Sequence, residues 1–214
     1  MKLVSINIGK AQQQQRKDFV ETTGIYKKPV SEPMEIKSLG IEDDVICDTK
    51  HHGGVDQAVY IYGADDYAWW SEELGRELAP GTFGENLTVS GLESAQFNVG
   101  DYLHIGRDVT LQVTAPRIPC GTFAARMGDP QWVKKFRAGE RPGLYARVIK
   151  EGIVKAGDKV SVEKYTGETI SILQMYRDHY AKGLSDDTIR RHLKAPIDIR
   201  SRINLELALQ KLQS

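Results

Sequence analysis

The chain has 214 residues, of which 40% are hydrophobic and 27% are charged. This composition is typical of a globular protein and excludes a disordered or fibrous one, and the length predicts one main domain with a small appendage. The 29 basic side chains balance the 29 acidic ones, so no overall field attracts the protein to a nucleic-acid polymer or an anionic membrane, and any anionic ligand needs a local cluster of donors.

The N-terminal segment and the cysteines predict the compartment. The apolar stretch at the start of the chain is too short for a secretory signal, and no run approaches the about 20 apolar residues that span a membrane. A chain of this length builds a core without disulfides, so Cys47 and Cys120 are expected to be reduced. We expect a cytoplasmic protein that does not bind membranes.

Short strand-like segments dominate the first two thirds of the chain. Residues 1–8 predict a first strand, and the glutamine run at 12–15 with the residues up to Thr23 predicts a solvated loop. Turn residues separate the later segments, and a Gly-Asp turn precedes another strand at 159–162. Strands are expected at 34–39, 44–47, 57–62, 87–90, 102–105 and 109–114. The fold class predicted is mainly β, a barrel or sandwich rather than a parallel α/β sheet.

Short helices interrupt these strands. Residues 64–78 place Tyr67 and Trp70 on one apolar face, which predicts a helix packed on the core. Residues 122–127 predict a helical turn, and residues 132–138 predict a short helix that ends at a glycine.

The C-terminal part changes to helical periodicity. Ser185 is a favourable N-cap, and the last helix carries an apolar stripe of Ile199, Ile203 and Leu207. Three helices are expected at 172–182, 185–194 and 198–213. We therefore predict a β domain over 1–165 and a three-helix domain over 166–214.

Cys120 is the first candidate for chemistry. Pro119 before it fixes the backbone and Gly121 after it lets the chain turn, so the thiol is presented at a rigid corner. A following helical turn and the nearby Arg117 favour the thiolate, which is a nucleophile or a soft-metal ligand. A buried structural thiol remains the alternative. Cys47, in an apolar strand-like segment, is expected to be buried and inert.

The run His51-His52-Gly53-Gly54 lies between two expected strands. Paired glycines there permit a left-handed backbone or the close approach of a ligand. Adjacent histidines in extended chain point in opposite directions, and no Cys-x-x-Cys or His-x-x-x-His spacing accompanies them, which argues against a zinc site. A ligand loop and a plain glycine turn both remain open.

Two further groups are weaker candidates. Glu85 and Asn86 follow a glycine directly before a strand, where they line a site or cap a turn. Lys134 and Arg137 share one face of the short helix, where they bind phosphate or are simply solvated.

Several motifs together resemble a known family. They are HHGGVDQAVYIY, PGTFGENLTVSGL, VGDYLHIG, VTLQVTAPRIPCGTFA and, after the basic helix, RPGLYARV. Their order and spacing resemble the MOSC domain in its YiiM-like branch, over roughly residues 40 to 165. The three C-terminal helices resemble the small helical domain that follows MOSC in that branch.

The resemblance implies a MOSC-type β-barrel in which Cys120 ligates the molybdenum of a pterin cofactor (molybdopterin) or carries sulfur. It implies reduction of N-hydroxylated compounds, such as hydroxylaminopurine bases, for detoxification. The site residues it implies around Cys120 are His52, Gly53, Gly54, Glu85, Asn86 and Arg117, with Lys134 and Arg137 for the cofactor's phosphate. His52 or Arg117 would aid departure of the substrate's oxygen. Related two-part reductases carry an additional N-terminal region, so electrons are expected from a separate flavin or iron-sulfur protein.

Two other functions remain open. Cys120 would hold a persulfide in a sulfur-carrier or cofactor-binding module, or it would act as the nucleophile of a hydrolase with His51 or His52 as base. The hydrolase lacks an evident third residue to orient the histidine. The physiological substrate, the redox partner, the role of the C-terminal helices and whether the chain forms a homodimer are also left open.

Overall fold

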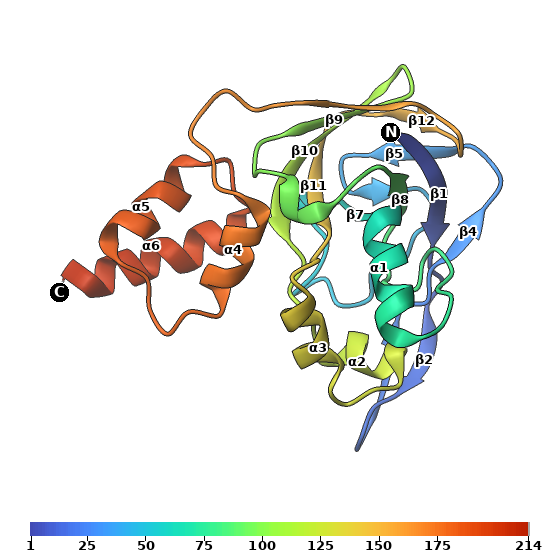
Figure 1. The fold of residues 1–214 in the computed structure, drawn as a ribbon, viewed down its shortest axis with the longest axis horizontal. Helices are drawn as coiled ribbons and strands as arrows, with labels where there is room; N and C mark the ends of the chain where they lie inside the picture. Colours follow the sequence, from blue (N-terminus) through green and yellow to red (C-terminus); the bar gives the residue numbers. More distant parts are fainter. Residues whose placement is uncertain (214) are drawn as a thin grey trace.

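The computed structural model describes residues 1–213, of which similar shares are helical and extended. Helices take up 30% of the residues and strands 29%, so the fold is mixed rather than mainly β (Figure 1). The strands are β1 (Lys2–Ile8), β2 (Gln12–Gln15), β3 (Val20–Thr23), β4 (Lys28–Val30), β5 (Met34–Lys37), β6 (Gly40–Ile41), β7 (Val59–Gly63), β8 (Leu87–Ser90), β9 (Tyr102–Ile105), β10 (Val109–Pro116), β11 (Leu144–Lys150), β12 (Gly152–Val154) and β13 (Val160–Glu163). The helices are α1 (Ala64–Leu74), α2 (Gly121–Met127), α3 (Trp132–Gly139), α4 (Ile172–His179), α5 (Asp186–Lys194) and α6 (Ile199–Gln213), with short 3-10 turns η1 (Val55–Gln57) and η2 (Ser94–Gln96).

Eight strands form the main sheet, in the order β13-β9-β10-β11-β7-β8-β1-β4. Among the residues that the structure describes, only β7 and β8 pair in parallel. All five residues of β7 are buried, because this strand lies inside the sheet and is covered on both faces, as its continuous apolar sequence requires. Two small sheets, β12-β5-β6 and β2-β3, flank the main one.

The predicted barrel is wrong, since no closed barrel is found among residues 1–213. The sheet does roll toward closure: Leu3 donates its N–H to the carbonyl of Asp158 and accepts from Gly157, at 2.8 and 2.7 Å. Further along the same strand, however, Ile6 pairs with Val30 of β4. The contact of β1 with the residues directly before β13 therefore stays an isolated bridge, between Lys2 and Lys159, and does not become a ladder.

Helices α1 to α3 pack an aromatic cluster against the sheet. Trp70, Phe83, Phe123, Trp132 and Phe136 are all at most 2% exposed, and the rings of Trp70 and Phe136 stack with their centroids 5.7 Å apart. The prediction that Trp70 belongs to the core is confirmed. The helix that carries it is shorter than predicted, because Gly75 ends it in a left-handed conformation.

The three predicted C-terminal helices are present as α4, α5 and α6, beside one end of the main sheet (Figure 1). Ser185 caps α5, accepting a hydrogen bond from the Thr188 N–H. Ile172 and Met175 of α4 join the main hydrophobic core. The division at residue 165 stays a prediction. The stripe on α6 faces outward instead of packing, since Ile203 and Leu207 are about half exposed.

Two local predictions are wrong. The glutamine run is no loop: β2 pairs with β3 in a hairpin, and the Gln14 side chain donates to the backbone carbonyl of Thr122 at 3.0 Å. This tertiary contact holds residues with little intrinsic preference for a strand. The expected strand at 44–47 is an irregular segment, because Asp44 turns inward to accept the N–H of Gly9 at 2.8 Å.

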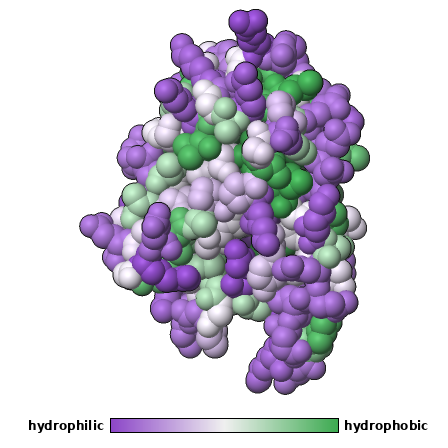
Figure 2. Space-filling model, turned by 90° about the vertical axis from the view of Figure 1, so that its right-hand side faces the viewer, coloured by the Kyte–Doolittle hydropathy of each residue, from purple (hydrophilic) through white to green (hydrophobic). Residues whose placement is uncertain are grey.

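The surface shown in Figure 2 lies on the side away from the C-terminal helices. It is mainly hydrophilic, with hydrophobic residues in small patches. Among residues 1–213, none of the helices combines the length and the apolar character needed to cross a membrane.

Candidate functional site

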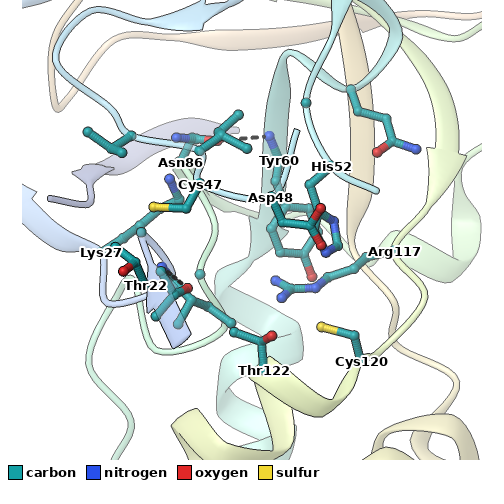
Figure 3. A pocket seen from close by; sticks show the side chains of 18 of the residues that line it. Thr22, Lys27, Cys47, Asp48, His52, Tyr60, Asn86, Arg117, Cys120 and Thr122 are labelled. Carbon is teal, nitrogen blue, oxygen red and sulfur yellow. Dashed lines mark hydrogen bonds between the residues drawn. The ribbon is translucent and has the colours of Figure 1, made fainter. Parts of the chain in front are cut away.

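A cavity of ≈ 120 Å³ lies between the main sheet, the β2-β3 hairpin and the segment before η1. We call it the inner cavity. Its lining includes Thr22, Lys27, His52, Asn86, Arg117 and Cys120. Figure 3 shows Cys120, Arg117 and His52 together on one side of this cavity, with Lys27 and Cys47 on the opposite side. The chain thus brings residues from widely separated segments to one place.

Cys120 is half-buried at the start of α2, where its backbone is still extended. Burial opposes ionisation of the thiol. A hydrogen bond with His52, the positive charge of Arg117 and the backbone N–H of Phe123 outweigh the burial and lower the pKa of Cys120 to about 6. The thiol is therefore mostly thiolate at neutral pH, the form that attacks electrophiles and binds soft metals.

Arg117 is 4% exposed and follows directly after β10. Its guanidinium carbon lies 4.8 Å from the ring centre of Tyr60 and 4.3 Å from that of Phe123, and Nη1 donates to the carbonyl of Phe83. Burial opposes the charge of Arg117, but the nearby Tyr145, Tyr60 and Cys120 raise its pKa above its ordinary value. Arg117 therefore stays a fixed cation beside the thiolate.

His52 reaches Cys120 from the turn that the paired glycines form. Gly53 and Gly54 have φ angles of +70° and +81°, a left-handed backbone that side-chained residues rarely adopt. The His52 N–H donates to the carbonyl of Asp48 at 3.0 Å. His51 instead pairs with the Asp48 carboxylate at 2.9 Å on the exposed side. The two histidines thus have different partners, and only His52 lines the inner cavity.

The opposite wall of the inner cavity holds a buried ion pair that the sequence did not reveal. Lys27 and Asp44 have side chains only 8% and 5% exposed and contact each other directly. Burial lowers the pKa of Lys27, and Asp44 opposes this shift. Asn86 donates to Asp44 at 2.9 Å and accepts the Tyr60 N–H at 3.1 Å. Asn86 therefore orients the carboxylate that holds Lys27 in place.

A second, larger cavity of ≈ 760 Å³ opens on the other side of Cys120, between the sheet and the C-terminal helices. We call it the outer groove. Its wall includes Ile118, Met175 and Leu205 together with Arg200. Four residues line both spaces: His52, Gln57, Cys120 and Tyr145. The thiol therefore lies where the two spaces meet, which the sequence did not predict.

Four predicted site residues do not line either cavity: Glu85, Lys134, Arg137 and Gly54. Glu85 is fully buried behind the site, where one carboxylate oxygen accepts from the Gly81 N–H at 2.7 Å and from the hydroxyls of Tyr67 and Thr88 at 2.8 Å each. Burial raises the pKa of Glu85, and these donors oppose the shift. Glu85 thus organises the turn before β8.

Lys134 and Arg137 lie on the exposed face of α3. The guanidinium of Arg137 stacks over Tyr180 at 4.1 Å, so Arg137 belongs to the contact between α3 and the end of α4. Gly54 is exposed and lies outside the inner cavity, whereas Gly53 lines it.

Cys47 contradicts its predicted role as a buried thiol. It is exposed and lies at the inner cavity, because the segment that carries it is not a strand. The residues missed by sequence reasoning, such as Lys27, Asp44, Tyr60 and Tyr145, lie far apart in the chain and carry no motif spacing. The structure identifies Lys27 and Asp44 by their buried ion pair, and Tyr60 and Tyr145 because they line the inner cavity.

The part of the chain that forms this site matches a known protein family. A profile of the MOSC domain matches residues 48–161, which is more than half of the chain and includes His52, Asn86, Arg117 and Cys120. The chain belongs to the MOSC family. The resemblance predicted from the motifs is thereby confirmed, and the match extends from the histidine turn to the middle of β13.

Similar proteins indicate the branch of the MOSC family to which this chain belongs. YflK of Bacillus subtilis is 35% identical over 86% of this chain and 83% of YflK. A reductase of Gibberella moniliformis is 29% identical over 90% of this chain, which spans only 34% of the fungal protein. The crystal structure of YiiM from Geobacillus stearothermophilus has a TM-score of 0.80 and 26% identity, covering 97% of this chain and 98% of that one. The protein is thus a YiiM-like MOSC protein, C-terminal helices included.

Proposed function

We propose that this MOSC protein is an oxidoreductase that binds a molybdenum-pterin cofactor through Cys120 and reduces N-hydroxylated compounds. The observation that carries the proposal is the Cys120 thiolate, held between His52 and Arg117 where the inner cavity meets the outer groove. MOSC domains are generally associated with the molybdenum cofactor, and one relative of this chain is named a reductase.

The residues around Cys120 fit such a cofactor. A thiolate is a ligand that soft metals prefer. Arg117 is a buried cation whose Nε has no hydrogen-bond partner among residues 1–213, and the Thr22 and Thr122 side chains add hydroxyl groups to the same cavity. These groups suit an anionic part of the cofactor. The inner cavity alone is small beside the about 300–1,000 Å³ of typical ligand pockets, so the cofactor would extend beyond it.

The proposed reaction adds two electrons and two protons to the N–O bond, giving the amine and water: R–NH–OH + 2e⁻ + 2H⁺ → R–NH₂ + H₂O. When bound, the cofactor supplies two-electron redox chemistry. A separate flavin or iron-sulfur protein would supply the electrons. The outer groove, with its apolar wall, would hold the body of the substrate while the N-hydroxyl group faces Cys120.

His52 is the proton donor in this proposal. A proton must reach the departing oxygen, and an imidazole is the side chain best suited to give one near neutral pH. Arg117 holds its proton too firmly to donate it, since its pKa is raised. Arg117 instead balances the charge of the thiolate and binds the anionic part of the cofactor.

The decisive experiment is metal and pterin analysis of protein produced in a host that makes the cofactor. Wild-type protein is expected to contain close to one molybdenum and one pterin per chain, and Cys120→Ser to lose both. Cys47→Ser is the matched control, because it removes the other thiol while leaving Cys120 and its partners in place; its metal content is expected to be unchanged. Full molybdenum content in Cys120→Ser would refute the proposal.

The lowered pKa of Cys120 also favours a second candidate, a sulfur carrier with a persulfide on this residue. Mass spectrometry showing a labile sulfur adduct on Cys120, in protein without pterin, would favour the carrier. The Cys120-His52 pair resembles the start of a cysteine hydrolase, but Asp48, whose carboxylate lies at the inner cavity, hydrogen-bonds His51. Failure of Cys120 to react with acyl electrophiles would remove the hydrolase.

A further inference from the structure

The C-terminal helices contact the segment that carries His52 through one side chain. Arg200, in the first turn of α6, donates from Nη1 to the carbonyl of Gly53 at 2.9 Å. Its Nη2 donates to the carbonyls of Thr49 and His52 at 3.3 Å each. A guanidinium is a rigid, planar fork with five donors, so one arginine can fix three carbonyls relative to one another.

These three carbonyls belong to a segment that no strand or helix holds in place. Residues 44–54 contain no strand or helix, and the paired glycines give the backbone more freedom than other residues would. Yet this segment carries His52, which lines both the inner cavity and the outer groove together with Cys120. Arg200 binds the carbonyls of His52 itself, of Gly53 directly after it and of Thr49 three residues before it.

The first turn of α6, which carries Arg200, is itself hydrogen-bonded to the sheet. The Ile199 N–H donates to the carboxylate of Asp56 at 2.8 Å, and Asp56 pairs with Arg147 of β11 at 2.9 Å. Arg147 also donates to the carbonyls of Pro196 and Ile197, at 3.1 and 3.2 Å. The start of α6 is therefore held against β11 and η1. Because its own position is fixed, Arg200 can fix the position of the segment that carries His52.

We propose that Arg200 is a positioning residue that holds residues 49–53 so that His52 stays against Cys120. The C-terminal helices are then part of the site and not an appendage to it. The effect of Arg200 on turnover rests on the proposed function, whereas its effect on the His52 segment does not. Both consequences follow from one side chain, so one substitution tests them.

The test uses cofactor-free full-length protein and a double-mutant cycle between Arg200→Gln and His52→Ala. Hydrogen exchange of the amides at 49–54 is expected to accelerate by about tenfold in Arg200→Gln, because local opening becomes easier. Alkylation of Cys120 by iodoacetamide at fixed pH is expected to slow in each single variant. The double variant should be no slower than His52→Ala alone, because Arg200 acts through His52.

The matched control is Arg202→Gln on the same helix. Arg202 also donates to backbone carbonyls, those of Leu193 and Ala195 at 2.9 Å each, but both lie within the helical region. This variant should leave the exchange at 49–54 and the alkylation of Cys120 unchanged. Arg200→Lys, which keeps the charge but not the fork, should restore part of the wild-type behaviour.

Three results would overturn the proposal: unchanged exchange at 49–54 in Arg200→Gln, additive effects of Arg200→Gln and His52→Ala on alkylation, or an equal effect of Arg202→Gln. None of these readouts requires molybdenum. If the protein is found not to bind the cofactor but the double-mutant cycle is non-additive, the positioning role of Arg200 stands and only the proposed function is refuted.

Discussion

The inner cavity and the outer groove meet at Cys120 but have different walls. Two buried cations line the inner cavity: Lys27, which is paired with Asp44, and Arg117, which lies between aromatic rings. The outer groove is larger, and much of its wall consists of apolar side chains such as Met175 and Leu205 from the C-terminal helices. Buried, paired charges fix the shape of a space because breaking a pair is costly, whereas apolar walls tolerate ligands of varied shape. This difference suits a fixed cofactor part on one side and the substrate on the other.

The largest expected effect is on the charged wall of the inner cavity. Asp44→Ala leaves Lys27 buried without its partner and frees the Gly9 N–H and the Asn86 amide, so the free energy of unfolding should fall by about 3–5 kcal/mol. Urea unfolding measures this. Asp43→Asn is the control: Asp43 is 70% exposed, and asparagine tolerates its left-handed backbone, so a change within about 0.5 kcal/mol is expected. Equal losses of unfolding free energy in both variants would show that the Lys27-Asp44 pair does not hold this wall of the inner cavity in place.

An intermediate effect is expected at the thiol that joins the two spaces. The rate of Cys120 alkylation should reach half its maximum near pH 6, because only the thiolate reacts. His52→Ala removes a contact that lowers this pKa, so the midpoint should rise; a rise of about two units would slow alkylation at pH 7 by roughly tenfold. His51→Ala should leave the profile unchanged, since His51 pairs with Asp48. A midpoint that stays near pH 6 without His52 would assign the shift to Arg117 and the Phe123 N–H.

The smallest effect is expected in the apolar wall of the outer groove. Leu205→Asn makes this wall more polar, so kcat/KM for hydroxylaminopurine should fall by about threefold, while that for hydroxylamine, which has no ring, should not change. Leu207→Asn on the same helix is the control, because Leu207 is 50% exposed and lies outside the groove. Steady-state kinetics with a reduced dye as electron donor measures both substrates. Equal losses for the two substrates would contradict binding of the ring in this groove.

Sequence reasoning succeeded for features whose cause is local. The helices over α1, α3 and α4 to α6 were predicted because hydrophobic periodicity and capping residues act within a few turns. The glycine pair at 53–54 and the Pro119-Cys120-Gly121 corner were identified because backbone freedom is written in the residue type. The motifs around Cys120 also led to the MOSC family.

The errors have non-local causes. The Gln12–Gln15 strand depends on a partner strand and on Thr122, over 100 residues away. Cys47 was placed in a core because its neighbours are apolar, but the inward turn of Asp44 removes that strand. Lys134 and Arg137 are near Cys120 in sequence and share a helix face, yet α3 directs Arg137 toward Tyr180. Closeness in sequence did not predict a shared cavity.

By itself, the sequence determined which residue could carry the chemistry, because a thiol at a proline-glycine corner with an arginine three residues before it is a local fact. Only the tertiary structure decided what surrounds that thiol: His52 from one segment, Lys27 and Asp44 from two others, and Arg200 from the C-terminal helices. The reason is that electrostatic and hydrogen-bond interactions depend on distances of a few ångströms, and the fold, not the spacing in the chain, sets those distances.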